Sequence, residues 1–490
     1  MSVFRRKPLA TLLAQASDHC GLKRTLSAQG LIALGVGAII GAGLFVRTAA
    51  ASAEAAGPAV VLSFVVAAIG CAFAGICYAE FASMLPIAGS AYTYSYVTMG
   101  EFVAWIIGWA LVLEYALGAV TVAIGWSEYL NNLFHGGIPY QWCHSVLQTS
   151  PQGVRGIVNA PALLVLLLIT LILIKGIKES AAVNAVIVFI KVTIVILFIA
   201  VGWSFISPAN HTPFMIPAGT PGHEGTFQHG WGGVLGGASI VFFAFIGFDA
   251  VSTAAQETKD PGRDMPIGIL GSLAFCTILY ILFGYVLTGV GRWQEFLTVG
   301  KEASVAFAIQ NHMPGYGWLA TLVTVAILFG FTSVILVMLL GQSRVFFSMA
   351  NDGLLPKIFS ELHPSFRTPY KCNALLFVFA GALAGILPGD ITGDLTSIGT
   401  LFAFMLVCIG VWIMRRKQPN VPRPFRTPLV PVVPLLGTII CAGMIIALNH
   451  RSQLVAFLWM LAGLTIYFGY SRTHSKLNRP DVEAATPALK

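Results

Sequence analysis

Long apolar runs without charge restrict the fold of this chain more than any other feature. Residues 58–79 contain no Asp, Glu, Lys or Arg, and neither do residues 180–190 or 192–223. A run of about 20 apolar residues can cross the hydrocarbon core of a bilayer, where the backbone must bond to itself as a helix. The runs lack the two-residue alternation of barrel strands. With 10% charged residues among 490, the sequence predicts an all-α integral membrane protein.

Twelve membrane-spanning helices can be placed along the chain. They are expected at residues 29–50, 58–84, 101–131, 157–174, 181–206, 231–257, 266–290, 315–349, 373–388, 396–414, 429–448 and 452–471. If both termini are cytoplasmic, the segments on that side contain 22 of the 28 Lys and Arg residues, and the opposite segments contain 5. Such an excess is typical of cytoplasmic loops. We therefore expect a multi-pass protein of the cytoplasmic membrane, and we attribute its basic charge to topology rather than to nucleic-acid binding.

Two of the expected spans contain glycine near their midpoints. Span one contains Gly41 and Gly43, and span six contains Gly247 two residues before Asp249. Glycine costs a helix about 1 kcal/mol relative to alanine and allows the backbone to open. Interruptions at corresponding positions of two halves indicate a transporter binding site. The alternative is close helix packing, because Gly37 and Gly41 also fit the small-xxx-small pattern.

An opened helix creates a site for a molecule with two opposite charges. The N–H groups at the start of the second half-helix attract a carboxylate, and the carbonyls at the end of the first attract an ammonium. An α-amino acid carries both groups a short distance apart. Two such breaks side by side are therefore expected to bind its zwitterionic end through the backbone.

Several motifs resemble those of the amino acid–polyamine–organocation permeases, specifically the cationic amino acid transporter branch. They keep the family order over nearly the whole chain, at residues 37–45, 77–82, 86–94, 242–253, 263–266, 351–356 and 396–401. One departure is Gln256 before Glu257, where many relatives have two consecutive acids.

The resemblance implies a fold of twelve helices in two inverted five-helix repeats, with helices one and six broken, plus two peripheral helices. The implied segments are a cytoplasmic N-terminus at 1–28, repeats at 29–206 and 231–414, peripheral helices at 429–471 and a cytoplasmic tail at 472–490.

The same resemblance implies which residues bind the substrate. The amides of Ala42 and Gly43 would hold the carboxylate, and carbonyls of span one and span six would hold the ammonium. The two binding segments comprise Ile39, Ile40, Gly41, Ala42, Gly43, Phe243, Ala244, Phe245 and Ile246, with the carbonyls of Ile39, Phe243 and Ile246 as acceptors. Phe245 and Phe248 are candidates to cover the substrate, or else they pack or face lipid. Met338 in span eight is expected to form an apolar pocket wall.

Charged residues inside spans are costly and by default mark function. Lys191 in span five is expected to face span one, or else to extend toward the inner membrane surface. In relatives with this lysine, which are proton-coupled, its ammonium would take the place of a sodium ion, and loss and gain of its proton would mimic ion binding. Glu114 in span three either couples to Lys191 or is a neutral acid bonded locally. Asp249 is expected to cap the second half of span six. Glu80 near the inner end of span two is expected to be a gate or structural acid.

The combined expectation is a secondary active transporter of L-amino acids that works by proton symport and alternating access. An exchanger is the alternative, with a small membrane partner attached through Cys143, and a non-transporting sensor is the third. The substrate and membrane lipid are the expected partners. Catalytic groups, metal ligands and cofactors other than the coupling proton are not expected. The choice between cationic and neutral amino acids stays open.

Overall fold

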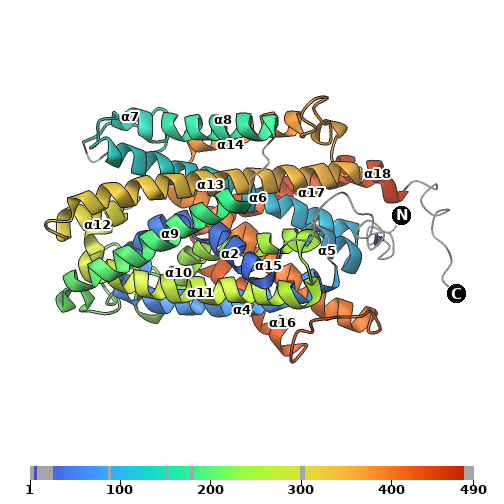
Figure 1. Ribbon diagram of the computed structural model, residues 1–490, viewed down its shortest axis with the longest axis horizontal. Coiled ribbons are helices and arrows are strands. Elements are labelled where there is room, and N and C mark those ends of the chain that lie inside the picture. The colour runs from blue at the N-terminus through green and yellow to red at the C-terminus, as the bar shows by residue number, and fades with distance from the viewer. Residues whose placement is uncertain are drawn as a thin grey trace.

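Helices make up almost all of the computed structural model, which describes residues 5–7, 26–85, 90–150, 152–176, 181–297 and 304–478. Within these ranges the only β-type pairings are two isolated bridges. Most of the expected terminal segments, the motif residues 86–89 and the side chain of Gln256 lie outside this description. The helices form one elongated bundle, with both described chain ends on the same side (Figure 1). We call this end of the bundle the termini side.

The helices account for all twelve expected spans. Eight helical stretches are long and apolar enough to cross a membrane within the described residues, and four shorter apolar helices accompany them. Spans one to five are α2 (Ala28–Ile39) with η1 (Gly43–Arg47), α3 (Thr48–Ala51) and η2 (Ser52–Ala56); α4 (Val60–Met84); α6 (Glu101–Leu133); α8 (Ala160–Lys175); and α9 (Ala181–Gly202). Spans six to ten are α10 (Gly230–Val241) with η6 (Phe242–Phe245) and η7 (Asp249–Glu257); α11 (Pro261–Val290); α13 (Gly317–Asn351); α14 (Tyr370–Ile386); and α15 (Gly389–Lys417). The last two are α16 (Val432–Ala447) and α17 (His450–Ile466).

Short helices connect the spans at both ends of the bundle. Helix α5 (Ser90–Thr98) lies on the termini side, while α7 (Tyr140–Cys143) and α12 (Ser304–His312) lie at the opposite end (Figure 1). The chain is therefore a multi-pass membrane protein.

Helices five spans apart pack on each other, as two related halves require. Helix α6 packs on α13, α4 on α11, α8 on α14, and η1 on η6. Helices α16 and α17 pack outside these pairs, mainly on α15. This arrangement is consistent with two inverted repeats and two peripheral helices, and the exact repeat boundaries stay a prediction.

Span ten begins earlier than expected, at Gly389 rather than at residue 396. The added turns contain Asp390 and Asp394, whose charge made the segment resemble a loop. Asp390 lies in the first turn, where the helix dipole favours an acid. Asp394 is buried because it pairs with a basic residue of span one, as described below.

Candidate functional site

Span one is open at the expected position. Helix α2 ends at Ile39, and Ile40 adopts an extended conformation with φ −72° and ψ 105°. The next half-helix begins with the Leu44 N–H, which donates to the Gly41 carbonyl at 3.2 Å. The N–H groups of residues 41–43 therefore stand at the free start of a helix, where the dipole is positive.

Span six is open at the matching depth. The 3₁₀ segment η6 ends at Phe245, Ile246 is extended with ψ 133°, and Gly247 has φ +113°. Side-chain-bearing residues rarely adopt this conformation. A Cβ atom at Gly247 would also lie 2.8 Å from the Ala38 carbonyl oxygen. Glycine is therefore required here both by backbone conformation and by contact with span one.

The two breaks touch each other. A Cβ atom at Gly43 would lie 2.1 Å from the Ala244 Cα, so the backbones are in direct contact. Gly43 thus serves both the opened backbone and the close packing of the two spans. Both openings lie inside the protein, and Ala42 and Ala244 are almost completely buried.

Tyr280 of α11 bridges the two breaks and was not identified from the sequence. Its hydroxyl lies 3.0 Å from the Ile39 carbonyl oxygen and 2.9 Å from that of Ala244. The expected ammonium acceptor Ile39 is therefore bonded to a tyrosine in this structure. The available signal was a tyrosine within an apolar span, since its hydroxyl needs a buried partner.

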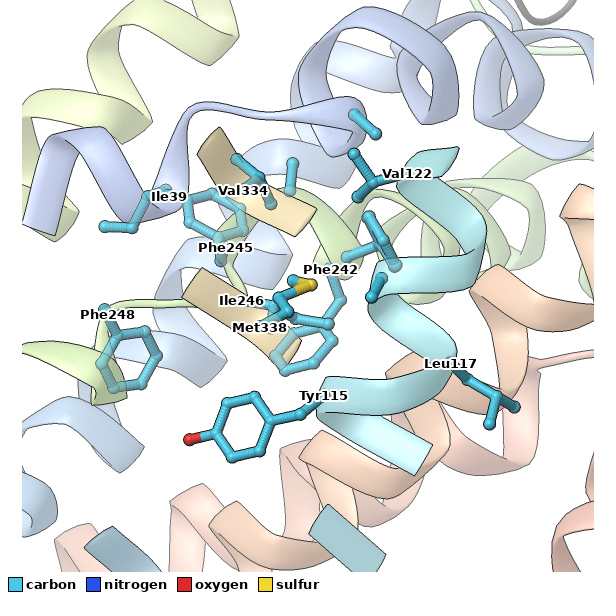
Figure 2. Close-up of a cluster of buried hydrophobic side chains, with 14 of the residues drawn as sticks. Ile39, Tyr115, Leu117, Val122, Phe242, Phe245, Ile246, Phe248, Val334 and Met338 are labelled. Atoms are coloured by element: carbon cyan, nitrogen blue, oxygen red, sulfur yellow. The ribbon is translucent and has the colours of Figure 1, made fainter. Parts of the chain in front are cut away.

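Apolar side chains surround the breaks (Figure 2). Phe245 packs against Tyr280 with ring centroids 5.4 Å apart, and Phe248 packs against Phe404 at 4.8 Å. Both phenylalanines are fully buried, which excludes the lipid-facing alternative for them. Met338 is also buried and lies beside Ile246 in the same cluster (Figure 2).

Lys191 faces span one, as expected. Its Nζ donates a hydrogen bond to the Gly37 carbonyl at 3.0 Å, and the side chain is buried. The stem packs on α13, where a Cβ atom at Gly330 would lie 3.0 Å from the Lys191 Cε. The lysine is therefore directed into the bundle and does not extend toward the membrane surface. It joins span five to span one directly before the break.

Glu114 is not paired with Lys191. It is fully buried on α6, and neither carboxyl oxygen has a hydrogen-bond partner among the described residues. Its nearest charged neighbour in electrostatic terms is Asp249 of η7. Of the two alternatives for Glu114, the contact with Lys191 is not formed, because the Lys191 ammonium bonds to the Gly37 carbonyl.

Asp249 is the first residue of η7, at the start of the second half of span six. The Tyr115 hydroxyl donates to the Asp249 Oδ2 at 3.0 Å. The carboxylate thus joins spans three and six, and its role as a cap of η7 stays a prediction.

Glu80 joins α4 to α15 and to the segment around Thr427 on the termini side of the bundle. Its carboxylate accepts two hydrogen bonds from Arg415 of α15, at 2.8 and 2.9 Å, and one from the Thr427 backbone N–H at 2.8 Å. The Arg423 guanidinium lies 3.2 Å away. The acid is 1% exposed, so these contacts compensate for its burial.

A second buried basic residue lies in a span. Arg47, in the second half of span one, donates to the Asp394 carboxylate of α15. The Ser452 hydroxyl of α17 donates to the other Asp394 oxygen at 3.2 Å. Lys191 is therefore not the only basic residue inside the bundle.

Cys143 is poorly placed to link a partner. It is a free cysteine in α7 with no exposed surface. Burial raises the pKa of its thiol to about 11. A disulfide with another chain would require this segment to open first.

A polytopic helical bundle in which two opened helices meet inside an apolar core is the architecture of a secondary transporter. The chain belongs to the amino acid permease family, because the family model described as "Amino acid permease" matches residues 26–473. It is thus a member of the amino acid–polyamine–organocation superfamily and a transporter rather than an enzyme.

Individual relatives match most of the chain. The branched-chain amino acid permease BcaP of Bacillus subtilis is 43% identical over 479 residues, covering 98% of this chain and 99% of the relative. The methylthioribose transporter of the same organism is 43% identical, with 98% and 100% coverage. The vacuolar cationic amino acid transporter 4 of Arabidopsis thaliana is 36% identical, with 86% and 68% coverage. The relatives named as permeases of amino acids span both neutral and cationic substrates.

Proposed function

We propose that this protein is a proton-coupled symporter that carries neutral, apolar L-amino acids by alternating access. In this proposal it lies in a cytoplasmic membrane with both termini in the cytoplasm. The observation that carries the proposal is the pair of touching breaks at Gly43 and Ala244, with free N–H groups on one side.

Backbone groups supply the recognition of the zwitterion. The amides of residues 41–43 point from a helix start and suit a carboxylate. The Ile246 carbonyl suits the ammonium, since the Phe243 carbonyl already accepts the Ile246 N–H at 3.3 Å. An ammonium at Ile39 would compete with the Tyr280 hydroxyl for that oxygen. We therefore assign Tyr280 the role of holding the two breaks together until substrate replaces it.

The side-chain pocket favours an apolar substrate. The residues around the breaks include Phe242, Phe245, Ile246 and Met338, and all are buried (Figure 2). A cationic side chain would need an anionic partner in this wall, because an unpaired buried charge is costly. Similarity to a branched-chain amino acid permease at 43% identity supports the same choice.

Lys191 provides a physical route for proton coupling. When it carries its proton, the ammonium bridges span five to the Gly37 carbonyl at the end of the inner half of span one. Loss of the proton removes charge from that bond, because a neutral amine is a weaker donor. Span one is then free to move relative to span five. Protonation and the position of the broken helix are thereby linked.

Glu114 and Asp249 form a second proton-accepting group in this proposal. Two carboxyl groups in one buried site are most stable when they share a proton. Tyr115 holds Asp249 at the start of η7, so a change of charge in the pair acts on the second half of span six. The proton sites on spans three and five would then act on the two broken helices separately.

The test is uptake by the purified protein in proteoliposomes with an imposed pH gradient. Labelled leucine, valine, alanine, lysine and arginine are supplied outside at acidic pH. We expect accumulation of the apolar amino acids and its collapse when a protonophore is added. Accumulation that persists with the protonophore, or that requires an amino acid inside the vesicles, would contradict proton symport and favour exchange.

Methylthioribose is a second candidate substrate, because a relative of equal identity is named as its transporter. This molecule lacks the carboxylate and ammonium that the breaks suit. Inclusion of methylthioribose in the uptake panel decides between the two. Preferred uptake of methylthioribose over leucine would contradict the claim that the two breaks recognise the zwitterionic end of an amino acid.

A further inference from the structure

Tryptophans lock peripheral helix α17 to α6. The rings of Trp109 and Trp459 stack with centroids 4.5 Å apart, and each indole N–H donates to the other residue's carbonyl, at 2.8 and 3.2 Å. The Trp105 indole donates to the Gly463 carbonyl at 2.9 Å. A Cβ atom at Gly463 would lie 2.3 Å from the Trp109 ring. The contact between α6 and α17 is therefore tightly packed at these residues, and the two helices cannot move closer together there.

Next to these tryptophan contacts, a groove separates α17 from α6. A cavity of about 280 Å³ lies between α6, α15, α16 and α17. Its walls are apolar except for Gln453, and its rim includes Ile446 and Phe457, which are 61% and 59% exposed. The groove is thus continuous with the surface that faces lipid. The tryptophan contacts fix the distance between α6 and α17, which form two of its walls.

The groove runs along α17. Along α17 its lining extends from Gln453 to Met460, which at 1.5 Å per residue is roughly 10 Å. The one polar lining residue lies at the end where α17 begins. The Gln453 amide donates to the carbonyls of Ile445, Ile446 and Leu448 at 2.9 Å each. No polar group deeper in the lining is left to hold water.

The mouth of the groove carries basic character. The Gln453 Oε1 lies 3.2 Å from the Nδ1 of His450, the first residue of α17. His450 and its neighbour Arg451 are both exposed at this end. A guanidinium such as that of Arg451 at the end of a membrane helix attracts lipid phosphates, and the His450 ring can donate a hydrogen bond to them. The groove is therefore polar at its mouth and apolar inside, in the same arrangement as the headgroup and acyl chain of a phospholipid.

We propose that this groove binds one acyl chain of a membrane glycerophospholipid, with the lipid phosphate at the His450 and Arg451 end. An apolar space excludes water, and if left empty its walls would lose their dispersion contacts. Hydrocarbon is the solvent that borders the open rim. A small groove along a membrane-spanning helix fits a chain better than the broad face of a second copy of the protein.

The bound chain would lie against the contact between spans three and ten. Gly399 of α15 is part of the groove wall. A Cβ atom at Gly399 would lie 2.6 Å from the Leu113 Cβ and 3.3 Å from the Glu114 backbone nitrogen. The site is thus distinct from the substrate site but shares a wall with the helix that carries Glu114.

The test labels the full-length protein in vesicles of phosphatidylethanolamine and phosphatidylglycerol. A small fraction of the phosphatidylglycerol carries a diazirine in its acyl chain. After illumination, peptides are analysed by mass spectrometry. We expect adducts concentrated at residues 398–402 and 445–460. Filling the groove by Ala456→Phe, or covering its rim by Ile446→Trp, should lower this labelling by about tenfold, because the chain's space is taken.

Leu458→Trp is the matched control for the rim variant. Leu458 is 54% exposed on α17, the helix that carries Phe457 of the rim, and does not line the groove. Labelling of the groove in this variant should stay within about twofold of the unaltered protein, since a lipid-facing surface residue tolerates change. Ile446 on α16 is 61% exposed, so its variant does not threaten folding either. Uniform labelling of all lipid-facing helices would overturn the proposal, and so would links between two protein copies in place of lipid adducts.

Discussion

The Arg47 guanidinium and the Asp394 carboxylate form a buried ion pair that joins the second half of span one to the first turns of span ten. Two helices from different repeats are thereby tied at the end of the bundle opposite the termini. Ser452 of α17 adds a hydrogen bond to the same carboxylate. The pair is a point at which the broken first helix is held to the rest of the bundle.

We predict that Arg47→Met alone destabilises the protein strongly, because Asp394 is left buried without its partner. Removing one member of such a pair costs about 3–5 kcal/mol. Thermal unfolding in detergent would measure this. The double variant R47M/D394L should recover much of the loss. The exposed pair Lys371 and Glu361 serves as control, and Lys371→Ala should leave the unfolding temperature unchanged.

Lys191→Met should abolish accumulation driven by a pH gradient while leaving a folded protein. The substitution keeps a long apolar stem against Gly330 but removes the group that bonds to the Gly37 carbonyl. Uptake under a gradient is compared with exchange at equal pH, which needs no net proton movement. Full accumulation in this variant would exclude the residue from coupling.

Gly247→Ala should close or distort the break in span six. The backbone at φ +113° costs a side-chain-bearing residue about 1–3 kcal/mol, and the new Cβ would meet the Ala38 carbonyl. We expect loss of substrate binding, measured by calorimetry on purified protein. Gly443→Ala in α16 is the control, because nothing lies within 4 Å of its Cβ position. Equal binding by both variants would mean that the opened backbone is not part of the site.

Tyr280→Phe should weaken the connection between the two breaks. It removes one hydroxyl and leaves the carbonyls of Ile39 and Ala244 without that donor. An unsatisfied buried acceptor costs about 1–3 kcal/mol. The loss should be visible in thermal unfolding and should shrink when substrate is added, since the ammonium can bond to the Ile39 carbonyl. Tyr285→Phe, on a more exposed face of the same helix, should behave like the unaltered protein.

Cys143 should resist alkylation in the folded protein. Its thiol has a pKa of about 11, so at pH 8 it is almost entirely neutral, and reactivity rises only as the pH approaches 11. Maleimide labelling of Cys143 in native and unfolded protein, quantified by peptide mass spectrometry, tests this. Rapid labelling of the native protein, or a linked band on a non-reducing gel, would favour the alternative that the protein is an exchanger attached to a partner through Cys143.

The sequence alone determined the twelve spans and the two breaks, because these follow from local properties. An apolar run long enough for the bilayer becomes a helix wherever it lies, and glycine weakens a helix at its own position. The breaks at Gly41 and Gly247 were therefore visible without a structure. The orientation of Lys191 toward span one was expected from the resemblance to proton-coupled relatives, and a buried ammonium does need an acceptor.

Only the tertiary structure decided which groups meet. Glu114 and Lys191 were the obvious candidates to pair by charge, yet their helices direct them to different neighbours. Arg47 finds Asp394 far along the chain, and Tyr280 reaches the carbonyls of both breaks. Such contacts depend on how each helix is rotated and how deep it lies relative to its neighbours. Packing of the whole bundle sets both quantities, and no single segment carries that information.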